Sequence, residues 1–474
     1  TLAEKRKVEV MSINFAAFSN QDIIAALQTQ VVTGDVLTDQ DTLYKYSDDQ
    51  YSVVDQVILP LAVIEAATIA DVQAVLAVAR QYHLAVITKA TGTSVVSGSR
   101  GRSGAVILSL DRMNHILEVN PDDSVAVVEP GVINNDLDKA AREVGFFYAP
   151  DPGSKNISSI GGNVSTNAGG MSSVRYGVTK DNILGVKVVL ADGRLVTLGG
   201  RTLKQAFGYD LTQLFVGSEG TLGVIVEITV KLSPIPVGTP LTGIAFFKDM
   251  ADLAKGTGAL RRSGVYPTML EALDAATVAA LDRFEGTHYA DKHATMLIFK
   301  LDFSTPEILN ISEQTLTANG AFDVQVTDDP EQAAALLKLR QDMLPAIFKD
   351  KNHVMEDMAL LLSQMAGMMD YITSLGEKYG LELYVAGHAG DGNVHPSIVW
   401  DQNVTEPPAG AAEAISDMFK ETIRRGGTIS GEHAVGLQKN QWNNYELGET
   451  DYLQHQIKAL LDPMGLLNPQ VKIN

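Results

Sequence analysis

The chain has 474 residues, a formal net charge of −20 at pH 7 and no cysteine. This length exceeds what one ordinary hydrophobic core serves, so two or three domains are expected. The negative charge argues against binding to nucleic acid and repels the chain from an anionic membrane surface. The absence of cysteine excludes disulfides, iron–sulfur clusters, thiolate zinc sites and cysteine nucleophiles, and it fits a reducing cytoplasm.

A membrane-spanning segment is not expected. No apolar run reaches the roughly 18 residues that a span needs, because Asp55, Glu65 and Asp71 interrupt the best candidate stretch. A peripheral association with the membrane stays open. The first ten residues carry a small basic cluster without the apolar segment of a secretory signal, and Met11 is expected to start the native chain.

The first part of the chain predicts a helical lead-in over residues 12–50 and then a βαβ-like unit. This unit comprises a strand at 56–61, a helix at 68–82 that begins with Thr68 as its N-cap, and a strand at 84–88. The second strand leads into a loop of small residues, an arrangement that suits a phosphate in outline. The loop matches neither the Rossmann nor the Walker pattern, so a plain strand-to-helix turn is an equal alternative.

A glycine-rich stretch at residues 150–177 is the most unusual segment of the chain. It contains six glycines in twenty-eight residues, interleaved with Ser, Thr and Asn. We expect neither a packed helix nor an ordinary strand there, but a backbone that approaches a ligand closely and offers N–H groups to an anion. Strand-like runs at 125–128 and 186–190 place the stretch inside a domain. The alternative is a long flexible loop.

The segments that follow predict a change of domain near residue 236. A hairpin at 186–198 and a strand after the glycine turn at 217–223 complete the first domain, and Pro234 and Pro236 end it. Strand-like pieces then alternate with amphipathic helices, which predicts a separate domain that covers the substrate. The expected strands are 242–247, 295–301 and 322–326, and the expected helices are 251–262, 270–283 and 330–344.

Four polar side chains on two glycine-bent segments form the strongest candidate site. His388 and His395 lie in GHAGDGNVHP, and Glu432 and His433 lie side by side in GTISGEHAVG. Two imidazoles and a carboxylate commonly bind a catalytic divalent metal, and the fourth group can then act as a base. Zn²⁺, Mn²⁺ and Fe²⁺ suit these ligands alike. The alternative is a pair of ordinary loop histidines and an exposed Glu–His pair.

Several ordered motifs resemble known FAD-binding loops. Residues 92–94 (GTS), 150–154 (PDPGS), 160–170 (IGGNVSTNAGG) and 217–223 (GSEGTLG) resemble the loops of the vanillyl-alcohol-oxidase/p-cresol methylhydroxylase superfamily. The two histidine segments resemble its FAD-linked D-2-hydroxy-acid dehydrogenase branch. That branch includes D-lactate dehydrogenases, glycolate oxidase flavin subunits and D-2-hydroxyglutarate dehydrogenases, and the resemblance covers nearly the whole chain.

The resemblance implies an α+β fold in four parts. An N-terminal helical lead-in over residues 12–50 precedes an FAD-binding domain of the p-cresol methylhydroxylase (PCMH) type over residues 51–236, built of two α+β subdomains. An antiparallel-sheet cap that carries the substrate and metal sites follows over residues 237–455. A C-terminal tail over residues 456–474 returns to pack on the flavin domain.

The resemblance also implies roles for named side chains. His433 would be the catalytic base, and His388, His395 and Glu432 would hold a divalent metal, Zn or Mn. Arg340, His388 and His395 would bind the substrate. FAD would bind non-covalently, because the glycine loops contain no His or Cys. Its expected contacts are Gly92, Thr93, Ser94, Pro130, Gly131, Asp151, Gly153, Ser154, Gly161, Gly162, Asn163, Ser165, Asn167, Gly223, Val224, Ile225 and Asn468.

By similarity, the reaction is a metal-assisted oxidation of a D-2-hydroxy acid to the 2-oxo acid. His433 takes the hydroxyl proton while hydride passes from Cα to flavin N5, and Arg340 pairs with the substrate carboxylate. No match to the lysine that some 2-hydroxyglutarate enzymes use lies near Glu356 and Asp357, so D-lactate is favoured. Residues 88–90 read Thr-Lys-Ala where the family usually has Pro-Arg-Gly.

Other interpretations of the same motifs stay open. Within the branch, the chain is alternatively a glycolate or D-2-hydroxyglutarate dehydrogenase, and within the superfamily an oxidase or a lipid-ether synthase. A non-catalytic flavin-binding subunit is a different class, against which the four retained polar groups argue. The expected partners are a small 2-hydroxy acid, a separate electron acceptor such as a quinone or an electron-transfer flavoprotein, and a second copy in a homodimer, but no nucleic acid.

Overall fold

The computed structural model describes residues 18–49 and 57–473, and its first sheet has four strands in the order β1-β2-β4-β3. β2 and β3 both run parallel to β4, whereas β1 runs antiparallel to β2. The strands are β1 (Asp35–Leu37), β2 (Ala62–Glu65), β3 (Val86–Lys89) and β4 (Val106–Ser109), and the helices are α1 (Asn20–Gln30), α2 (Gln40–Tyr46) and α3 (Ile69–Tyr82).

Helix α3 confirms the predicted helix of the βαβ-like unit. Thr68 is its N-cap and accepts a hydrogen bond from the backbone N–H of Asp71, whose side chain accepts one from Thr68 in return. The strand expected at residues 56–61 is wrong in position, because β2 begins at Ala62. Residue 56 and the expected start at Met11 lie outside the described residues.

The second sheet is antiparallel and has the order β5-β6-β10-β8-β9. Its β8–β9 hairpin and its last strand confirm the sequence prediction for this region. The strands are β5 (Ile116–Asn120), β6 (Val125–Val128), β8 (Ile183–Val189), β9 (Leu195–Gly199) and β10 (Val224–Lys231). Helices α4 (Asn134–Arg142), α5 (Ile160–Thr166) and α7 (Thr212–Phe215) contribute apolar residues to its core.

The glycine-rich stretch is partly helical, which corrects the prediction that it excludes a packed helix. Helix α5 lies within it, and Ile160, Gly161 and Val164 of this helix are buried. A Cβ at position 161 would overlap Pro130, so glycine allows α5 to lie directly against this residue, which follows strand β6. The rest of the stretch contains a short helix α6 (Ser173–Tyr176) joined by loops.

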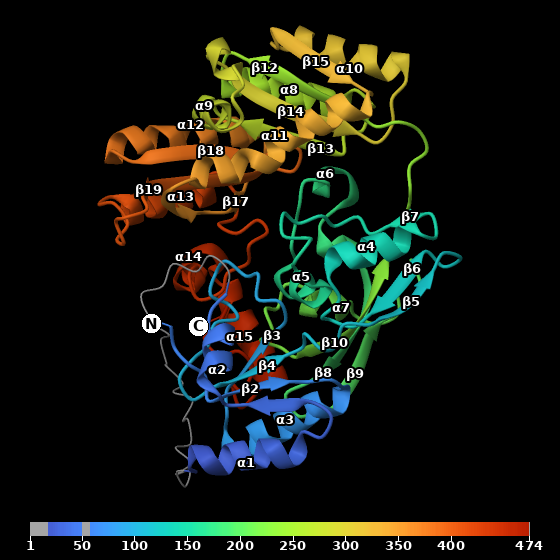
Figure 1. Cartoon of the computed structure of the whole chain (residues 1–474), viewed down its shortest axis with the longest axis vertical. Helices are drawn as coiled ribbons and strands as arrows, with labels where there is room; N and C mark the ends of the chain where they lie inside the picture. Colours follow the sequence, from blue (N-terminus) through green and yellow to red (C-terminus); the bar gives the residue numbers. More distant parts are fainter. Residues whose placement is uncertain (1–17, 50–56, 474) are drawn as a thin grey trace, which may run out of the picture.

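The third sheet has eight strands and forms the cap in the upper half of Figure 1. The order is β15-β12-β14-β13-β18-β19-β16, with β17 paired to β19, and neighbouring strands run antiparallel. The strands are β12 (Leu241–Phe247), β13 (Met269–Leu273), β14 (Thr295–Leu301), β15 (Asp323–Thr327), β16 (Lys351–Met355), β17 (Met358–Ala359), β18 (Glu382–His388) and β19 (Asn393–Asp401). The helices are α8 (Met250–Arg262), α9 (Ala275–Glu285), α10 (Pro306–Ala318), α11 (Pro330–Phe348), α12 (Leu362–Tyr379) and α13 (Ala411–Arg424).

The helix expected at residues 270–283 is wrong in its first part. Met269–Leu273 is strand β13, paired to β14 and β18, and all five of its residues are buried. Asp274 then caps helix α9 by accepting the backbone N–H of Thr277 at 2.7 Å. Helix-forming residues here enter the centre of a sheet because tertiary packing overrides a weak local preference.

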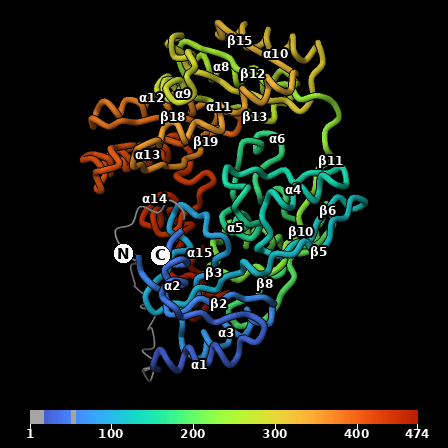
Figure 2. The backbone as a smooth tube through the Cα atoms, viewed as in Figure 1, coloured from blue at the N-terminus to red at the C-terminus, as the bar shows by residue number. Residues whose placement is uncertain are grey.

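The C-terminal segment returns from the cap to the first sheet, as predicted. The chain crosses to the cap after β11 (Ser233–Pro234) and comes back before α14 (Asn443–Leu447) and α15 (Thr450–Leu461), which Figure 2 shows beside the N-terminal elements. Val86 of β3 donates to the carbonyl of Leu466, and Asn468 donates back to Val86, both at 2.8 Å. No helix in the described ranges is long and apolar enough to cross a membrane. The expected domain boundaries stay predictions.

We expect Asn468→Ala to destabilise the half of the protein that contains the first two sheets. Its Nδ2 donates to the buried carbonyls of Gly98 (2.9 Å) and Glu219 (2.8 Å), and losing both bonds costs about 2 kcal/mol. Denaturant unfolding measures this loss. Asn403→Ala, in an exposed loop, is the control and is expected to change stability by less than about 0.5 kcal/mol. An Asn468 variant as stable as this control contradicts the prediction.

Candidate active site

The β18–β19 hairpin places two histidines on one face of the cap sheet. Its register pairs Ala386 with His395, and His388 follows Ala386 by two residues in the same strand. Because side chains alternate along a strand, His388 and His395 share a face. Both are buried, with 5% and 8% of their surface exposed, and their ring centroids lie 5.2 Å apart.

Asp357 holds the loop that carries the other two predicted groups. This fully buried residue lies between β16 and β17. Its Oδ2 accepts hydrogen bonds from three successive backbone N–H groups, those of Gly431 (2.8 Å), Glu432 (3.0 Å) and His433 (2.9 Å). The contact fixes the directions of the Glu432 and His433 side chains. Sequence reasoning missed this role, although Asp357 stands out as a charged residue before a long apolar run.

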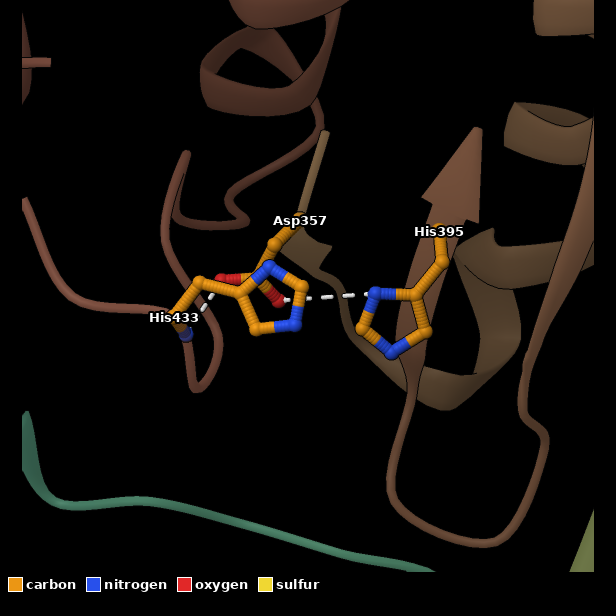
Figure 3. A group of neighbouring side chains, drawn as sticks. All are labelled: Asp357, His395 and His433. Carbon is orange, nitrogen blue, oxygen red and sulfur yellow. Dashed lines mark hydrogen bonds and ion pairs between the residues drawn. The ribbon is translucent and has the colours of Figure 1, made fainter. Parts of the chain in front are cut away.

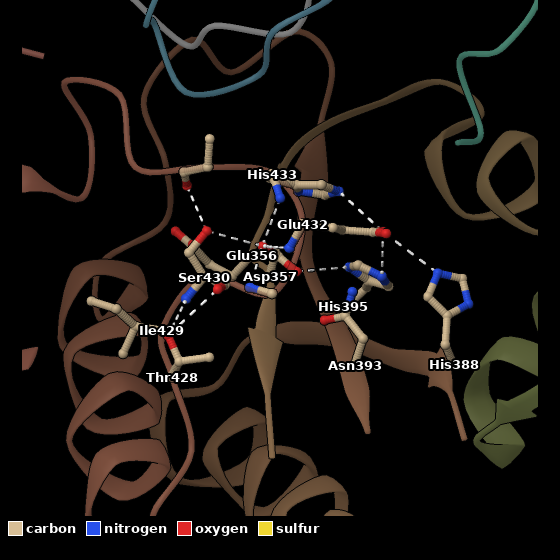
Figure 4. A network of polar contacts seen from close by, with 12 residues as sticks. Glu356, Asp357, His388, Asn393, His395, Thr428, Ile429, Ser430, Glu432 and His433 are labelled. Carbon is tan, nitrogen blue, oxygen red and sulfur yellow. Dashed lines mark hydrogen bonds and ion pairs between the residues drawn. The ribbon is translucent and has the colours of Figure 1, made fainter. Parts of the chain in front are cut away.

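Glu432 brings the predicted residues together at one point (Figure 4). Its Oε1 lies 3.2 Å from Nε2 of His395, 3.5 Å from Nε2 of His388 and 3.8 Å from Nε2 of His433. Donor atoms of His388, His395 and Glu432 all lie within 4.8 Å of one another. Two imidazole nitrogens and a carboxylate oxygen at this spacing fit a divalent cation with open coordination positions.

The charges around this point favour a cation. Burial opposes a charge on His388, but the Glu271 and Glu432 carboxylates outweigh it and raise the pKa of His388 well above its usual range. Burial also opposes ionisation of Glu432, yet hydrogen bonds from His388 and His395 hold its pKa well below the usual value. An ionised carboxylate therefore faces the imidazole nitrogens, and it stabilises positive charge between them.

His433 belongs to a second group with Asp357 and His395 (Figure 3). The rings of His395 and His433 stack with centroids 5.2 Å apart, and His395 Nδ1 lies 4.0 Å from Asp357 Oδ1. Burial lowers the pKa of His433, against the opposing charge of Asp357. The ring is therefore neutral near pH 7 and can accept a proton.

Arg340 of helix α11 joins the same network through Glu271. Its Nε–H donates to Oε2 of Glu271, and Oε1 of Glu271 lies 2.5 Å from Nδ1 of His388. The side chain of Arg340 is only 15% exposed, so it is not the ordinary surface charge that its helix alone suggests. Sequence reasoning missed Glu271, the one charged residue in the buried strand MLEAL.

The predicted FAD contacts lie in loops and element ends of the first two sheets and meet through backbone contacts. Gly161 N–H donates to the carbonyl of Pro130, and Glu219 N–H donates to that of Ser165, both at 2.8 Å. Gly92, Thr93 and Ser94 follow β3, and Pro130 and Gly131 follow β6. Asp151, Gly153 and Ser154 precede α5, which contains Gly161, Gly162, Asn163 and Ser165 and has Asn167 as its C-cap. Gly223 precedes β10, Val224 and Ile225 are its first residues, and Asn468 lies in the tail.

Several buried polar atoms in these loops and in the adjoining elements lack a partner within the described residues. They are Thr88 Oγ1, Ser99 Oγ, Ser158 Oγ, Asn163 Nδ2 and Ser218 Oγ. Buried polar groups in folded proteins are nearly always hydrogen-bonded. Unpaired hydroxyl and amide groups from several loops therefore fit a large polar ligand such as FAD.

Two residues in these segments contact the protein itself. Both carboxylate oxygens of Asp151 accept hydrogen bonds from Ser172, from its backbone N–H at 2.9 Å and its hydroxyl at 2.8 Å. Asp151 thus links the two ends of the glycine-rich stretch through hydrogen bonds. Its contact with FAD stays a prediction. Lys89 donates from Nζ to the carbonyls of Tyr46 (2.9 Å) and Asp48, so this departure from the family pattern directs its charge into the protein.

The glycine-rich stretch touches the histidine cluster directly. A Cβ at Gly169 would overlap Oε2 of Glu432 and lie 3.1 Å from its Cβ, and a Cβ at Gly390 would lie 2.6 Å from Cβ of Val174. The absence of side chains at Gly169 and Gly390 therefore permits the close approach of the two halves. The glycine-rich stretch and the predicted metal ligand Glu432 are therefore in direct contact.

Solved structures define the class of fold. Over 96% of this chain and 97% of the other, the protein matches p-cresol methylhydroxylase with substrate bound, with a TM-score of 0.76 and 19% identity. It matches 4-ethylphenol oxidase from Gulosibacter chungangensis equally well, with a TM-score of 0.76 and 18% identity. The chain thus shares the fold of p-cresol methylhydroxylase, and the predicted α+β class is confirmed.

Matches to protein-family models and to relatives identify the family within this class of fold. Residues 60–199 match "FAD binding domain", and residues 241–471 match "FAD linked oxidases, C-terminal domain". The chain is 34% identical over 416 residues to "Glycolate oxidase subunit GlcD" of Bacillus subtilis, covering 87% of this chain and 88% of the relative. It is 30% identical to "D-lactate dehydrogenase [cytochrome], mitochondrial" of Arabidopsis thaliana (95% and 79% covered) and 32% identical to "D-2-hydroxyglutarate dehydrogenase" of Stutzerimonas stutzeri (94% and 98%). The chain belongs to the FAD-linked oxidases, in the D-2-hydroxy-acid dehydrogenase branch, and is an FAD-linked oxidoreductase.

We expect Gly169→Ala to disturb the histidine cluster while the protein keeps FAD. The new methyl group overlaps Oε2 of Glu432, so this carboxylate must move away from the histidines and the variant should lose affinity for a divalent metal. Ile157→Ala, in the same stretch, is the control, because its side chain is 50% exposed and it is not one of the predicted FAD contacts. Metal titration and the flavin absorbance of both variants test this. Unchanged metal binding in Gly169→Ala would show that the contact is unimportant.

Proposed function

We propose that this chain catalyses the FAD-dependent, metal-assisted oxidation of a D-2-hydroxy acid to the 2-oxo acid, with D-lactate favoured. The observation that carries the proposal is the position of Glu432 Oε1, 3.2–3.8 Å from Nε2 of three histidines and beside the glycine-rich stretch. The names of the relatives support a 2-hydroxy acid as the substrate class, since they include lactate, glycolate and 2-hydroxyglutarate enzymes.

His388, His395 and Glu432 would hold the metal through Nε2, Nε2 and Oε1, which the spacing of these atoms supports. A bound divalent cation would lower the pKa of the substrate hydroxyl, and bound FAD would accept the hydride. Nδ1 of His388 faces the Glu271 carboxylate, which only accepts hydrogen bonds. Nδ1 therefore keeps its proton, and Nε2 would be the ligand atom when a bound cation takes the place of the Nε2 proton.

His433 is the proposed base. Its Nε2 lies 3.8 Å from Glu432 Oε1, next to the proposed ligand atoms, and burial keeps the ring neutral by lowering its pKa. The hydrogen bond from its backbone N–H to Asp357 fixes the residue in place. His433 can therefore take the hydroxyl proton without a rearrangement of the loop.

Arg340 is the proposed partner of the substrate carboxylate, and the surrounding charges support a monocarboxylate. Its Nε–H is used by Glu271, which leaves the terminal guanidinium groups for a carboxylate. Lys439, a buried cation beside Asp357, donates to the carbonyls of Asp357 (2.9 Å) and Ile429 (2.8 Å) and pairs with Glu356 at 3.3 Å. Because Lys439 is already satisfied, it is not available for a second substrate carboxylate, and this favours D-lactate over D-2-hydroxyglutarate.

A second candidate is a non-catalytic flavin-binding subunit, because one relative is named as a subunit of glycolate oxidase. The complete cluster of ligands and base argues against it, since a chain without catalysis does not need them. Glycolate and D-2-hydroxyglutarate remain the alternative substrates. The separate electron acceptor, the homodimer, the cytoplasmic location and non-covalent FAD stay predictions.

We expect His433→Ala to retain FAD but to reduce it with D-lactate about 10²–10⁴-fold more slowly, the usual loss when an acid–base group is removed. Anaerobic stopped-flow measurement of flavin absorbance gives the rate. His353→Ala, in strand β16 and stacked on Phe348, is the control and should react at the wild-type rate. Wild-type reduction of the flavin by His433→Ala would falsify the assignment of the base.

We expect chelation to abolish activity and Mn²⁺ or Zn²⁺ to restore it. The cation would stabilise the deprotonated hydroxyl of the substrate by several kcal/mol, so its loss lowers kcat/KM by about 10²-fold or more. Assays of D- and L-lactate, glycolate and D-2-hydroxyglutarate with a dye acceptor, before and after chelation, measure this loss together with the substrate preference, which we expect to favour D-lactate. Full activity in a protein shown by elemental analysis to contain no metal contradicts the metal assignment, and inactivity toward all four acids favours the non-catalytic subunit.

A further inference from the structure

Glu271 connects two parts of the proposed site that come from different elements. It lies in the middle of β13, where it is 2% exposed and directly opposite His388 of β18 in the strand register. One oxygen, Oε1, accepts from Nδ1 of His388 at 2.5 Å, and the other, Oε2, accepts from Nε of Arg340. A single carboxylate therefore contacts both a proposed metal ligand and the proposed carboxylate-binding group.

The hydrogen bonds from His388 and Arg340 stabilise the negative charge of Glu271, which burial in the sheet otherwise disfavours. A carboxylate removed from water is stable only when it is paired and hydrogen-bonded. Here the strand neighbour supplies an imidazole N–H, and helix α11, which packs on β12 and β14, supplies a guanidinium N–H. The sheet and this packing fix the backbones of His388 and Arg340. The directions of the His388 ring and the Arg340 guanidinium then depend on their hydrogen bonds to Glu271.

We propose that Glu271 is a positioning residue that sets the separation between the metal ligand His388 and the substrate-binding Arg340. A 2-hydroxy acid carries its carboxylate and hydroxyl on adjacent carbons, so the groups that bind them must be held at a fixed separation. The inference rests on the proposed function, because it takes His388 as a metal ligand and Arg340 as the carboxylate partner. It adds that one buried carboxylate of the cap orients both.

A purely structural ion pair makes a different prediction. If Glu271 only stabilised the cap, its loss would lower the unfolding temperature and leave metal affinity and KM unchanged. If it positions His388 and Arg340, both binding constants change in protein that remains folded and loaded with FAD. A carboxylate that accepts a hydrogen bond from a metal-bound histidine typically raises metal affinity 10–100-fold.

The test uses FAD-loaded, chelator-treated protein with Glu271→Gln, which keeps the shape and removes the charge. We expect Mn²⁺ affinity, measured from free Mn²⁺ by electron paramagnetic resonance, to fall about 10–100-fold, and KM for D-lactate in Mn²⁺-saturated enzyme to rise about tenfold with a smaller change in kcat. Glu271→Asp keeps the charge but is shorter, so it should fall between wild type and Glu271→Gln. Asp274→Asn is the control, because this buried carboxylate caps α9 and contacts neither His388 nor Arg340.

Wild-type Mn²⁺ affinity or wild-type KM in Glu271→Gln overturns the proposal. If that variant fails to retain FAD, Glu271→Asp decides, and wild-type values of both constants in it overturn the proposal as well. The behaviour of the unmutated protein separates this inference from the proposed function. If wild type binds no Mn²⁺, the metal-assisted function fails too, whereas normal binding in wild type and in Glu271→Gln removes only the role of Glu271.

Discussion

The carboxylate of Asp357 accepts three successive backbone N–H groups, and the arrangement of the site depends on this contact. Residues 431–433 belong to neither a helix nor a strand, so no regular structure fixes them. Hydrogen bonds to a charged acceptor are worth about 1.5–3 kcal/mol each, and Asp357 makes three of them with no exposed surface. Glu432 and His433 therefore keep their directions although they lie in a loop.

The same principle recurs on the opposite side of the cluster. Glu271 holds His388 as Asp357 holds the loop of His433, and each carboxylate comes from a different part of the cap. The proposed metal site thus lies between two buried carboxylates that are far apart in sequence. Gly169 completes the arrangement, since its missing side chain lets the glycine-rich stretch reach Glu432.

Features formed by residues close together in the sequence were predicted correctly, whereas contacts between residues far apart in the sequence were missed. The capping box of α3, the β8–β9 hairpin and the two histidine segments were predictable because their residues are neighbours in the chain. Glu271 and Asp357 were not, because their partners lie 117 and 74–76 residues away. Strand β13 was predicted as helix for a related reason, since its place at the centre of a sheet is decided by strands β14 and β18 and not by its own composition.

The position of the tail has a consequence for synthesis of the chain. Strand β3 is an edge strand of the first sheet, and its Val86 forms backbone hydrogen bonds with residues 466 and 468 on the side away from β4. Because residues 466–468 follow the cap in the chain, the first sheet receives these partners only after the whole cap has been synthesised. A chain truncated before residue 466 therefore lacks the backbone partners of Val86 and the predicted FAD contact Asn468.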